Sequence, residues 1–265
     1  LARCLSAQER YEEAIKLRRM ELAWCQANND VDADDMLISM HGLGRDLLAA
    51  GETDEALEVL KNCLIQRQQA LGPCDDDTLG TLTKVLEAYA LLGRQRQALA
   101  LSQEAQAALA AELGENHPKV LTQLSNQASL HDELGELEQA EALYRRCLQG
   151  YEQSLKSDDQ DLLLCMQRLA MLLSAQDRPA EAEPLYRRAL GILKDSLGLE
   201  HPDTLAAVYS LANALSEQGR HAEAIPLRRR ELAWCRQENG DMDPGTLTSI
   251  NDLAIDLRET GELEE

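Results

Sequence analysis

The chain has 265 residues, of which 44% are hydrophobic and 28% are charged, and its formal net charge at pH 7 is −21. This charge argues against nucleic acid or an anionic membrane as the main partner, because both would repel the chain. Leucine, alanine, glutamate, glutamine and arginine dominate while phenylalanine is absent, which favours helices over a β-sandwich or barrel. No apolar run approaches the ~20 residues of a membrane-spanning helix, so we expect a soluble chain without a membrane partner.

The predicted elements follow one another as helix pairs. Residues 1–5 match the second half of a first helix, and residues 11–27 form the second helix of that pair. Further helices are predicted at 36–50, 54–71, 77–92, 95–113, 118–134, 137–155, 161–175, 179–197, 202–218, 221–238 and 245–260. Both ends cut through a pair, so we expect a window from a longer array or a chain whose flanking parts are missing.

A period of 42 residues runs through the whole chain. An alanine recurs at this step, at Ala14, Ala56, Ala98, Ala140, Ala182 and Ala224. Five residues before it lies a turn position, numbered zero below, which is held by Glu9, Gly51, Gly93, Gly135, Asp177, Gly219 and Gly261. This periodicity predicts a single repeat array over 1–265. We expect partial repeats at 1–27 and 240–265 and full repeats at 28–71, 72–113, 114–155, 156–197 and 198–239.

Apolar residues recur at positions −11, −8 and −4 of each first helix, so they share one helical face. Small residues at −7 and the recurrent alanine at +5 let the two helices of a pair approach closely. This spacing resembles the tetratricopeptide repeat. The stretches EAEPLYRRAL at 181–190 and LGLEHPDT at 197–204 resemble the kinesin-light-chain type of that repeat.

The resemblance implies an all-α fold, an α-α superhelix (tetratricopeptide repeat solenoid) of antiparallel helix pairs that serves mainly to bind peptides and proteins. In that family, paired asparagines often occupy positions −10 and −9 on the concave surface. Only Asn126 and Asn251 match here, so kinesin cargo recognition is not carried over.

The residues that could carry chemistry favour structural roles. Asp30, Asp32 and Asp34 have the spacing of a calcium loop, but Asp35 stands where glycine is needed and His41 where a bidentate glutamate is needed. We therefore expect no metal. The aspartates at 75–77 and 158–159, like those before residue 36, precede helices and are expected to cap them.

Histidines and cysteines show no catalytic or zinc-binding pattern. His117 and His201 precede prolines and are expected in turns, and His131 is expected to be packed. We predict no enzyme activity and no cofactor, because the chain has no phosphate loop, nucleophile elbow or HExxH helix. The cysteines are predicted to be small buried hydrophobes in a reducing cytoplasm: Cys4, Cys25, Cys63, Cys74, Cys147, Cys165 and Cys235.

Arginines at position +10 predict a solvated outer face, supported by Glu141–Arg145 and Glu183–Arg187 pairs. The stripe consists of Arg19, Arg145, Arg187 and Arg229.

In this repeat type, positions −13, −10, −9 and −6 of the first helices line the concave groove. The −9 row reads Gly42, Lys84, Asn126, Arg168, Ser210 and Asp252. We predict a peptide-binding site at Arg45, Lys84, Asn126, Gln167 and Arg168, in which the cations receive an acidic segment of the partner and Asn126 bonds its backbone. The alternative is that Lys84 pairs with Glu87 and Arg168 with a neighbouring acid.

The function predicted from these features is a non-catalytic scaffold that holds a peptide or protein segment in the groove. The alternative is a sensor or regulatory arm of a larger protein, for example one fused to a caspase-like peptidase or a signalling ATPase. We also expect self-association through uncapped ends, because nothing in the sequence follows to cover the face that carries Ile250, Leu253 and Leu257.

Overall fold

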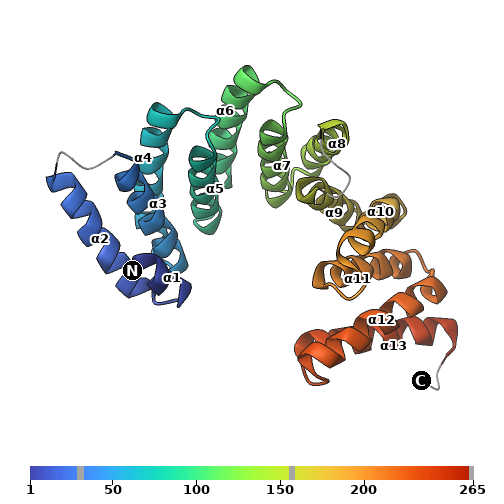
Figure 1. Cartoon of the computed structure of the whole chain (residues 1–265). Helices are drawn as coiled ribbons and strands as arrows, with labels where there is room; N and C mark the ends of the chain where they lie inside the picture. The colour runs from blue at the N-terminus through green and yellow to red at the C-terminus, as the bar shows by residue number, and fades with distance from the viewer. Residues whose placement is uncertain (29–32, 155–158, 263–265) are drawn as a thin grey trace. The chain divides into compact units, whose positions relative to one another are not determined.

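The computed structural model describes residues 1–28, 33–154 and 159–262, and these residues form thirteen α-helices and no strand (Figure 1). The helices are α1 (Ala2–Ala7), α2 (Tyr11–Ala27), α3 (Ala33–Ala49), α4 (Thr53–Leu71), α5 (Asp76–Leu91), α6 (Gln95–Leu113), α7 (Pro118–Glu133), α8 (Leu137–Ser154), α9 (Gln160–Ala175), α10 (Pro179–Leu197), α11 (Pro202–Glu217), α12 (His221–Asn239) and α13 (Pro244–Thr260). Most predicted ends agree to about one residue. The largest difference is at α3, which begins at Ala33 rather than 36.

The chain folds as two compact units, Leu1–Glu136 and Leu137–Glu265. The first holds α1 to α7 and the second holds α8 to α13, so the division falls inside the predicted third repeat, 114–155. Within each unit, helices adjacent in the chain pack on one another. The all-α solenoid of helix pairs is confirmed.

The turn within each pair has the geometry that its sequence predicts. Every glycine at the turn position has a positive φ, for example 83° at Gly51, and the two other residues there, Glu9 and Asp177, adopt a φ of 59°. After the turn at Gly51, the backbone N–H of Glu52 donates to the carbonyl oxygen of Leu47 over 2.9 Å, which closes the end of α3. The recurrent alanine that follows is completely buried in all six pairs.

A second periodic feature is the cap at the start of the first helices. Asp75, His117, Asp159, His201 and Asp243 lie one period apart, and each side chain accepts a hydrogen bond from the backbone N–H two residues ahead. The capping roles of the aspartates near 75 and 159 and the turn roles of the two histidines are confirmed. Asp30 and Asp32 lie outside the described residues.

Two predictions about exposure are wrong. Cys4 is exposed on α1 and Cys74 is half-buried in the turn before α5, where its Sγ lies 3.0 Å from Glu112, whereas the other five cysteines are buried as predicted. Leu253 and Leu257 are buried rather than uncovered. They pack with Ile225 and Leu232 of α12, because α13 turns its −8 and −4 positions toward the preceding helix.

The outer arginine stripe is confirmed and also links neighbouring repeats. The Arg187 Nε lies 2.7 Å from Glu183, as predicted, and the Arg187 Nη2 lies 3.4 Å from Glu223 of the next repeat. Arg145 pairs likewise with Glu141 and with Glu181. The arginines of these pairs are about half exposed, and ion pairs at a solvated surface contribute little to stability.

Two buried ion pairs occupy equivalent places five periods apart. The Arg18 Nε lies 2.6 Å from the Asp46 Oδ2, and the Arg228 Nε lies 2.7 Å from the Asp256 Oδ2. The guanidinium of Arg18 fills the space beside Gly42, where an added Cβ would approach it to 2.2 Å. Glycine is therefore the residue that fits at this point of the −9 row.

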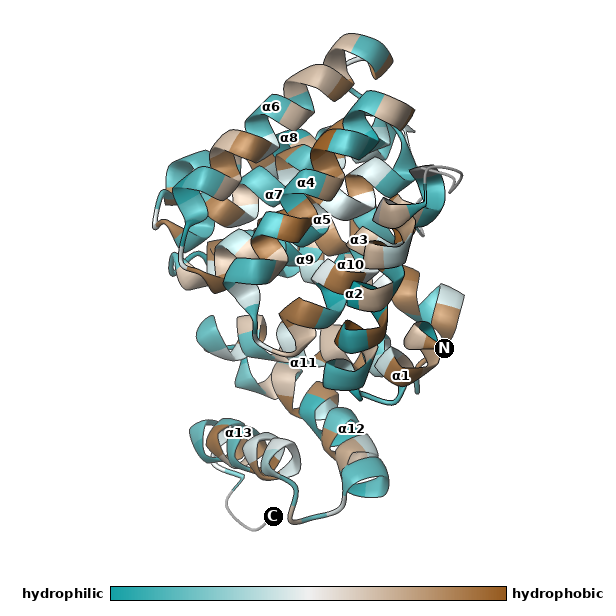
Figure 2. Ribbon diagram, turned by 90° about the vertical axis from the view of Figure 1, so that its left-hand side faces the viewer, coloured by the Kyte–Doolittle hydropathy of each residue, from teal (hydrophilic) through white to brown (hydrophobic). Residues whose placement is uncertain are grey.

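Apolar residues are interspersed with polar ones around the helices, and none of the described helices is long and apolar enough to span a membrane (Figure 2).

Candidate groove on the first helices

The predicted groove residues are divided between the two units. Arg45, Lys84 and Asn126 lie on α3, α5 and α7 of the first unit, and Gln167 and Arg168 lie on α9 of the second. Arg45 is exposed and the other four are half-buried. The structure brings each one to the expected position on a first helix.

Two of these cations have acidic neighbours on their own helices. The Lys84 Nζ lies 2.6 Å from the Glu87 Oε2, as the alternative reading of the sequence expects, and the Arg45 Nη2 lies 3.2 Å from the Asp46 Oδ1. The Lys84–Glu87 pair is open to solvent and therefore weak, so a partner carboxylate can compete for Lys84 at small cost, whereas the Arg45 contact is to the buried Asp46.

Two consecutive pockets open along the first helices of the second unit. One, of about 630 Å³, lies between α9 and α11 over α10 and is lined by Gln167. The other, of about 430 Å³, lies one period further on, between α11 and α13 over α12, where Tyr209 replaces Gln167. Ala206 of α11 lines both pockets, so they adjoin at this helix.

The two pockets differ in chemistry. In the first, four leucines form most of the apolar lining, and the polar lining is just as extensive: Leu163, Leu164, Leu193 and Leu197 against Gln160, Gln167, Ser196, His201 and Asp203. A pocket of this mixed lining can take an apolar side chain with neighbouring polar groups.

The second pocket is aromatic and acidic. Tyr209 and Trp234 are half-buried in its lining, beside the buried carboxylate of Glu231 and the thiol of Cys235. Burial, followed by the hydrogen bond to Glu231, raises the pKa of Cys235 to about 11. The thiol is therefore protonated at neutral pH and is not a nucleophile.

Sequence reasoning missed the three residues that distinguish this pocket. Tyr209 stands in the −10 row with Gln167, but its ring carries no charge, and the predicted site was built around cations. Glu231 and Trp234 belong to the second helix, which the family pattern does not assign to the groove.

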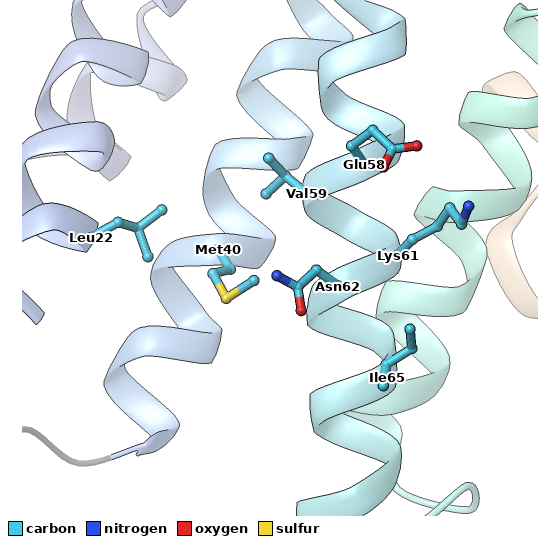
Figure 3. Close-up of a pocket in the computed structure, with 7 residues that line it drawn as sticks. All are labelled: Leu22, Met40, Glu58, Val59, Lys61, Asn62 and Ile65. Atoms are coloured by element: carbon cyan, nitrogen blue, oxygen red, sulfur yellow. The ribbon is translucent and has the colours of Figure 1, made fainter. Parts of the chain in front are cut away.

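The first unit has a different hollow, between the second helices α2 and α4. It measures about 600 Å³, and its apolar lining includes Leu22, Met40 and Ile65. Figure 3 shows the Met40 and Asn62 side chains pointing toward one another. No buried polar group is directed at a ligand here, so this hollow indicates no particular chemistry.

Within the described parts of the chain, no group of three or more histidine, cysteine, aspartate or glutamate side chains could hold a metal ion.

Comparison with known proteins decides the family. The sequence matches the tetratricopeptide repeat family over residues 1–64, 77–153, 162–227 and 204–265. The chain belongs to the tetratricopeptide repeat family. Repeats of this family generally mediate protein–protein interaction, and their fold is typically a non-catalytic scaffold. No curated protein matches the chain.

Solved structures agree with this assignment. A Podosopora anserina structure described as nearly identical tetratricopeptide-like repeats of a kinesin light chain is 25% identical, with a TM-score of 0.66 over 78% of this chain and 98% of that one. A signal transduction ATPase from Pyrococcus horikoshii with a tetratricopeptide repeat sensor is 14% identical, with a TM-score of 0.75 over 98% of this chain and 38% of that one. The quorum sensor NprR of B. thuringiensis is 15% identical, with a TM-score of 0.65 over 100% of this chain and 69% of that one. The last two likenesses concern the fold alone.

Proposed function

We propose that the chain is a non-catalytic scaffold that binds a peptide or protein segment along its first helices. The observation that carries this proposal is the pair of adjoining pockets in the second unit, which repeat at the period of the sequence and share Ala206. Repetition matters because an extended segment can place successive side chains in successive pockets, and side-chain pockets give such binding its specificity.

The predicted contacts of the site belong to this proposal. Arg45, Lys84 and Arg168 would receive carboxylates of an acidic segment, while Asn126 and Gln167 would hydrogen-bond its backbone. Gln167 lines the first pocket, which supports its inclusion. Lys84 would exchange Glu87 for a partner carboxylate, and binding would weaken with added salt.

A photo-crosslinking amino acid tests the location of the site. Placed at Ala206, which is exposed between the two pockets, it should capture the native partner of the chain. The matched control is Ala233, which is exposed on α12. Crosslinking that is equal at both positions, or stronger at Ala233, would place binding on another face.

Charge reversal tests the acidic partner separately. Lys84→Glu and Arg168→Glu together should abolish binding of the captured partner while the circular dichroism spectrum stays unchanged. If the double variant binds the partner at low ionic strength as tightly as the natural chain does, these cations are not part of the site. The pockets would then be tested alone.

The same groove would serve a sensor or regulatory arm of a larger protein, in which the bound segment acts on a domain outside these residues.

A cytoplasmic location is also part of the proposal, because the cysteines are free thiols and most are buried. Self-association of the chain would be measured by sedimentation before any binding experiment.

A further inference from the structure

The carboxylate of Glu231 is the unusual group in the second pocket. Glu231 is 8% exposed, and its Oε1 accepts hydrogen bonds from the Ser249 Oγ at 2.8 Å and the Cys235 Sγ at 3.1 Å. Its Oε2 is buried and has no hydrogen-bond partner in the described structure. A carboxylate can accept about four hydrogen bonds, and a buried oxygen that accepts none is costly. The side chain is therefore incompletely satisfied at the wall of a pocket.

The nearby cation Arg228 does not neutralise this carboxylate. Its Nε lies 2.7 Å from Asp256 and its Nη1 lies 3.2 Å from Asp252, so two aspartates balance its charge. Its Nη2 donates to the Asn213 Oδ1 over 2.8 Å. Glu231 forms no ion pair with any described residue, so no side chain of the described structure neutralises its charge.

The walls of the pocket suit a planar cation. Tyr209 and Trp234 supply aromatic surface, and the Arg228 guanidinium already lies 5.7 Å from the centre of the Tyr209 ring. A guanidinium stacks on aromatic rings and also donates two parallel hydrogen bonds to one carboxylate, whereas an ammonium is a compact and strongly hydrated charge. The volume of about 430 Å³ admits an arginine side chain.

We propose that the pocket of Tyr209, Glu231 and Trp234 binds an arginine side chain of the partner segment, with its guanidinium on the Glu231 carboxylate. This inference rests on the proposed function and adds the chemistry of one contact. The partner would then present an arginine to the end of the groove formed by α11 and α13 and an apolar side chain to the preceding pocket.

The chain contains its own control for this proposal. Glu21, Trp24 and Ser39 are the counterparts of Glu231, Trp234 and Ser249 five periods earlier, and the Ser39 Oγ donates to the Glu21 Oε2 over 2.9 Å. The position that corresponds to Tyr209 would precede residue 1, so this site has no tyrosine, and here Glu21 is exposed and Trp24 is 61% exposed. Glu21 and Trp24 therefore provide a comparison site that has the acid and the tryptophan but not the tyrosine.

Nuclear magnetic resonance of the two tryptophan indoles is the test, because Trp24 and Trp234 are the only tryptophans in the sequence. The probe is the tripeptide acetyl-Gly-Arg-Gly-amide, and a Trp24→Phe variant assigns the two signals. The peptide should shift the Trp234 signal saturably and leave that of Trp24 unchanged. The same peptide with citrulline, a neutral analogue of arginine, should shift neither.

Variants separate the pocket from the fold. Glu231→Gln should weaken binding of the arginine peptide by about tenfold or more, whereas Glu21→Gln should not change it. Ala206→Gln, at an exposed position, should obstruct the pocket and provides a second variant if Glu231→Gln unfolds. The proposal would be overturned if the arginine peptide did not shift the Trp234 signal, or if the citrulline peptide shifted it equally. It would also be overturned if the arginine peptide shifted this signal to the same extent in both pocket variants as in the natural chain. Crosslinking of the native partner at Ala206 that persists in Glu231→Gln would leave the proposed function standing and remove only this contact.

Discussion

Replacing Arg18 by leucine tests how much stability is lost when one partner of the buried ion pair of the first unit is removed. Arg18 is 4% exposed and Asp46 is 1% exposed, and the variant Arg18→Leu leaves the Asp46 carboxylate buried with only its contact to Arg45. Breaking one partner of a buried pair costs ~3–5 kcal/mol. We expect a loss of about 3 kcal/mol, at the low end of this range, because the Arg45 contact remains.

The double variant Arg18→Leu, Asp46→Ala should recover most of this loss. It copies Leu60 and Ala88, which occupy the same two positions one period later and are completely buried. Apolar replacement of a whole buried pair is often neutral, so we expect the double variant to lie within ~1 kcal/mol of the natural chain.

Urea unfolding followed by far-ultraviolet circular dichroism measures these differences, with hydrogen exchange of α2 and α3 as a local readout. Arg10→Leu is the matched control, because Arg10 pairs with Glu13 on the exposed surface and its loss should leave the unfolding midpoint unchanged. A stable Arg18→Leu variant would refute the argument from buried charge. A double variant as unstable as the single one would show that lost packing at residue 18 causes the effect.

Two further predictions concern packing and pH. Ala182→Leu should lower the free energy of unfolding by ~1–3 kcal/mol because Ala182 is completely buried, whereas Ala180→Leu, at an exposed position of the same helix, should lower it little. Equal shifts of the two melting temperatures by calorimetry would contradict this. Burial raises the pKa of Asp256, but hydrogen bonds from His221, Arg228 and Ser216 lower it by more, so its net pKa lies below the ordinary value. Asp256 should therefore add stability above the unfolded carboxyl pKa of about 3.9, and this stability should be lost as the pH falls through the lower pKa of the folded state. The melting temperature of the Asp256→Asn variant should therefore fall less steeply than that of the natural chain as the pH is lowered through this range. An equally steep fall in both proteins would show that Asp256 does not titrate in this way.

The sequence alone determined the helices and their pairing, because the signals that specify them are local. A first helix begins where Asp75 or His117 caps it and ends where Gly93 or Gly135 adopts a positive φ. The alanine at +5 had to be buried because two helices meet there, and it is buried in every pair. The positions of the predicted groove residues on first helices followed from the same period.

Only the tertiary structure decided which of these positions form pockets. A pocket between two first helices depends on the sizes of side chains a whole period apart and on the second helix beneath them, which no local pattern reports. Thus Tyr209 and Glu231 meet in one pocket although they come from different helices, while Lys84 turns to Glu87 on its own helix. The sequence also predicted that Leu253 is uncovered, because no further repeat follows it. In the structure Leu253 is buried because this face of α13 packs against α12.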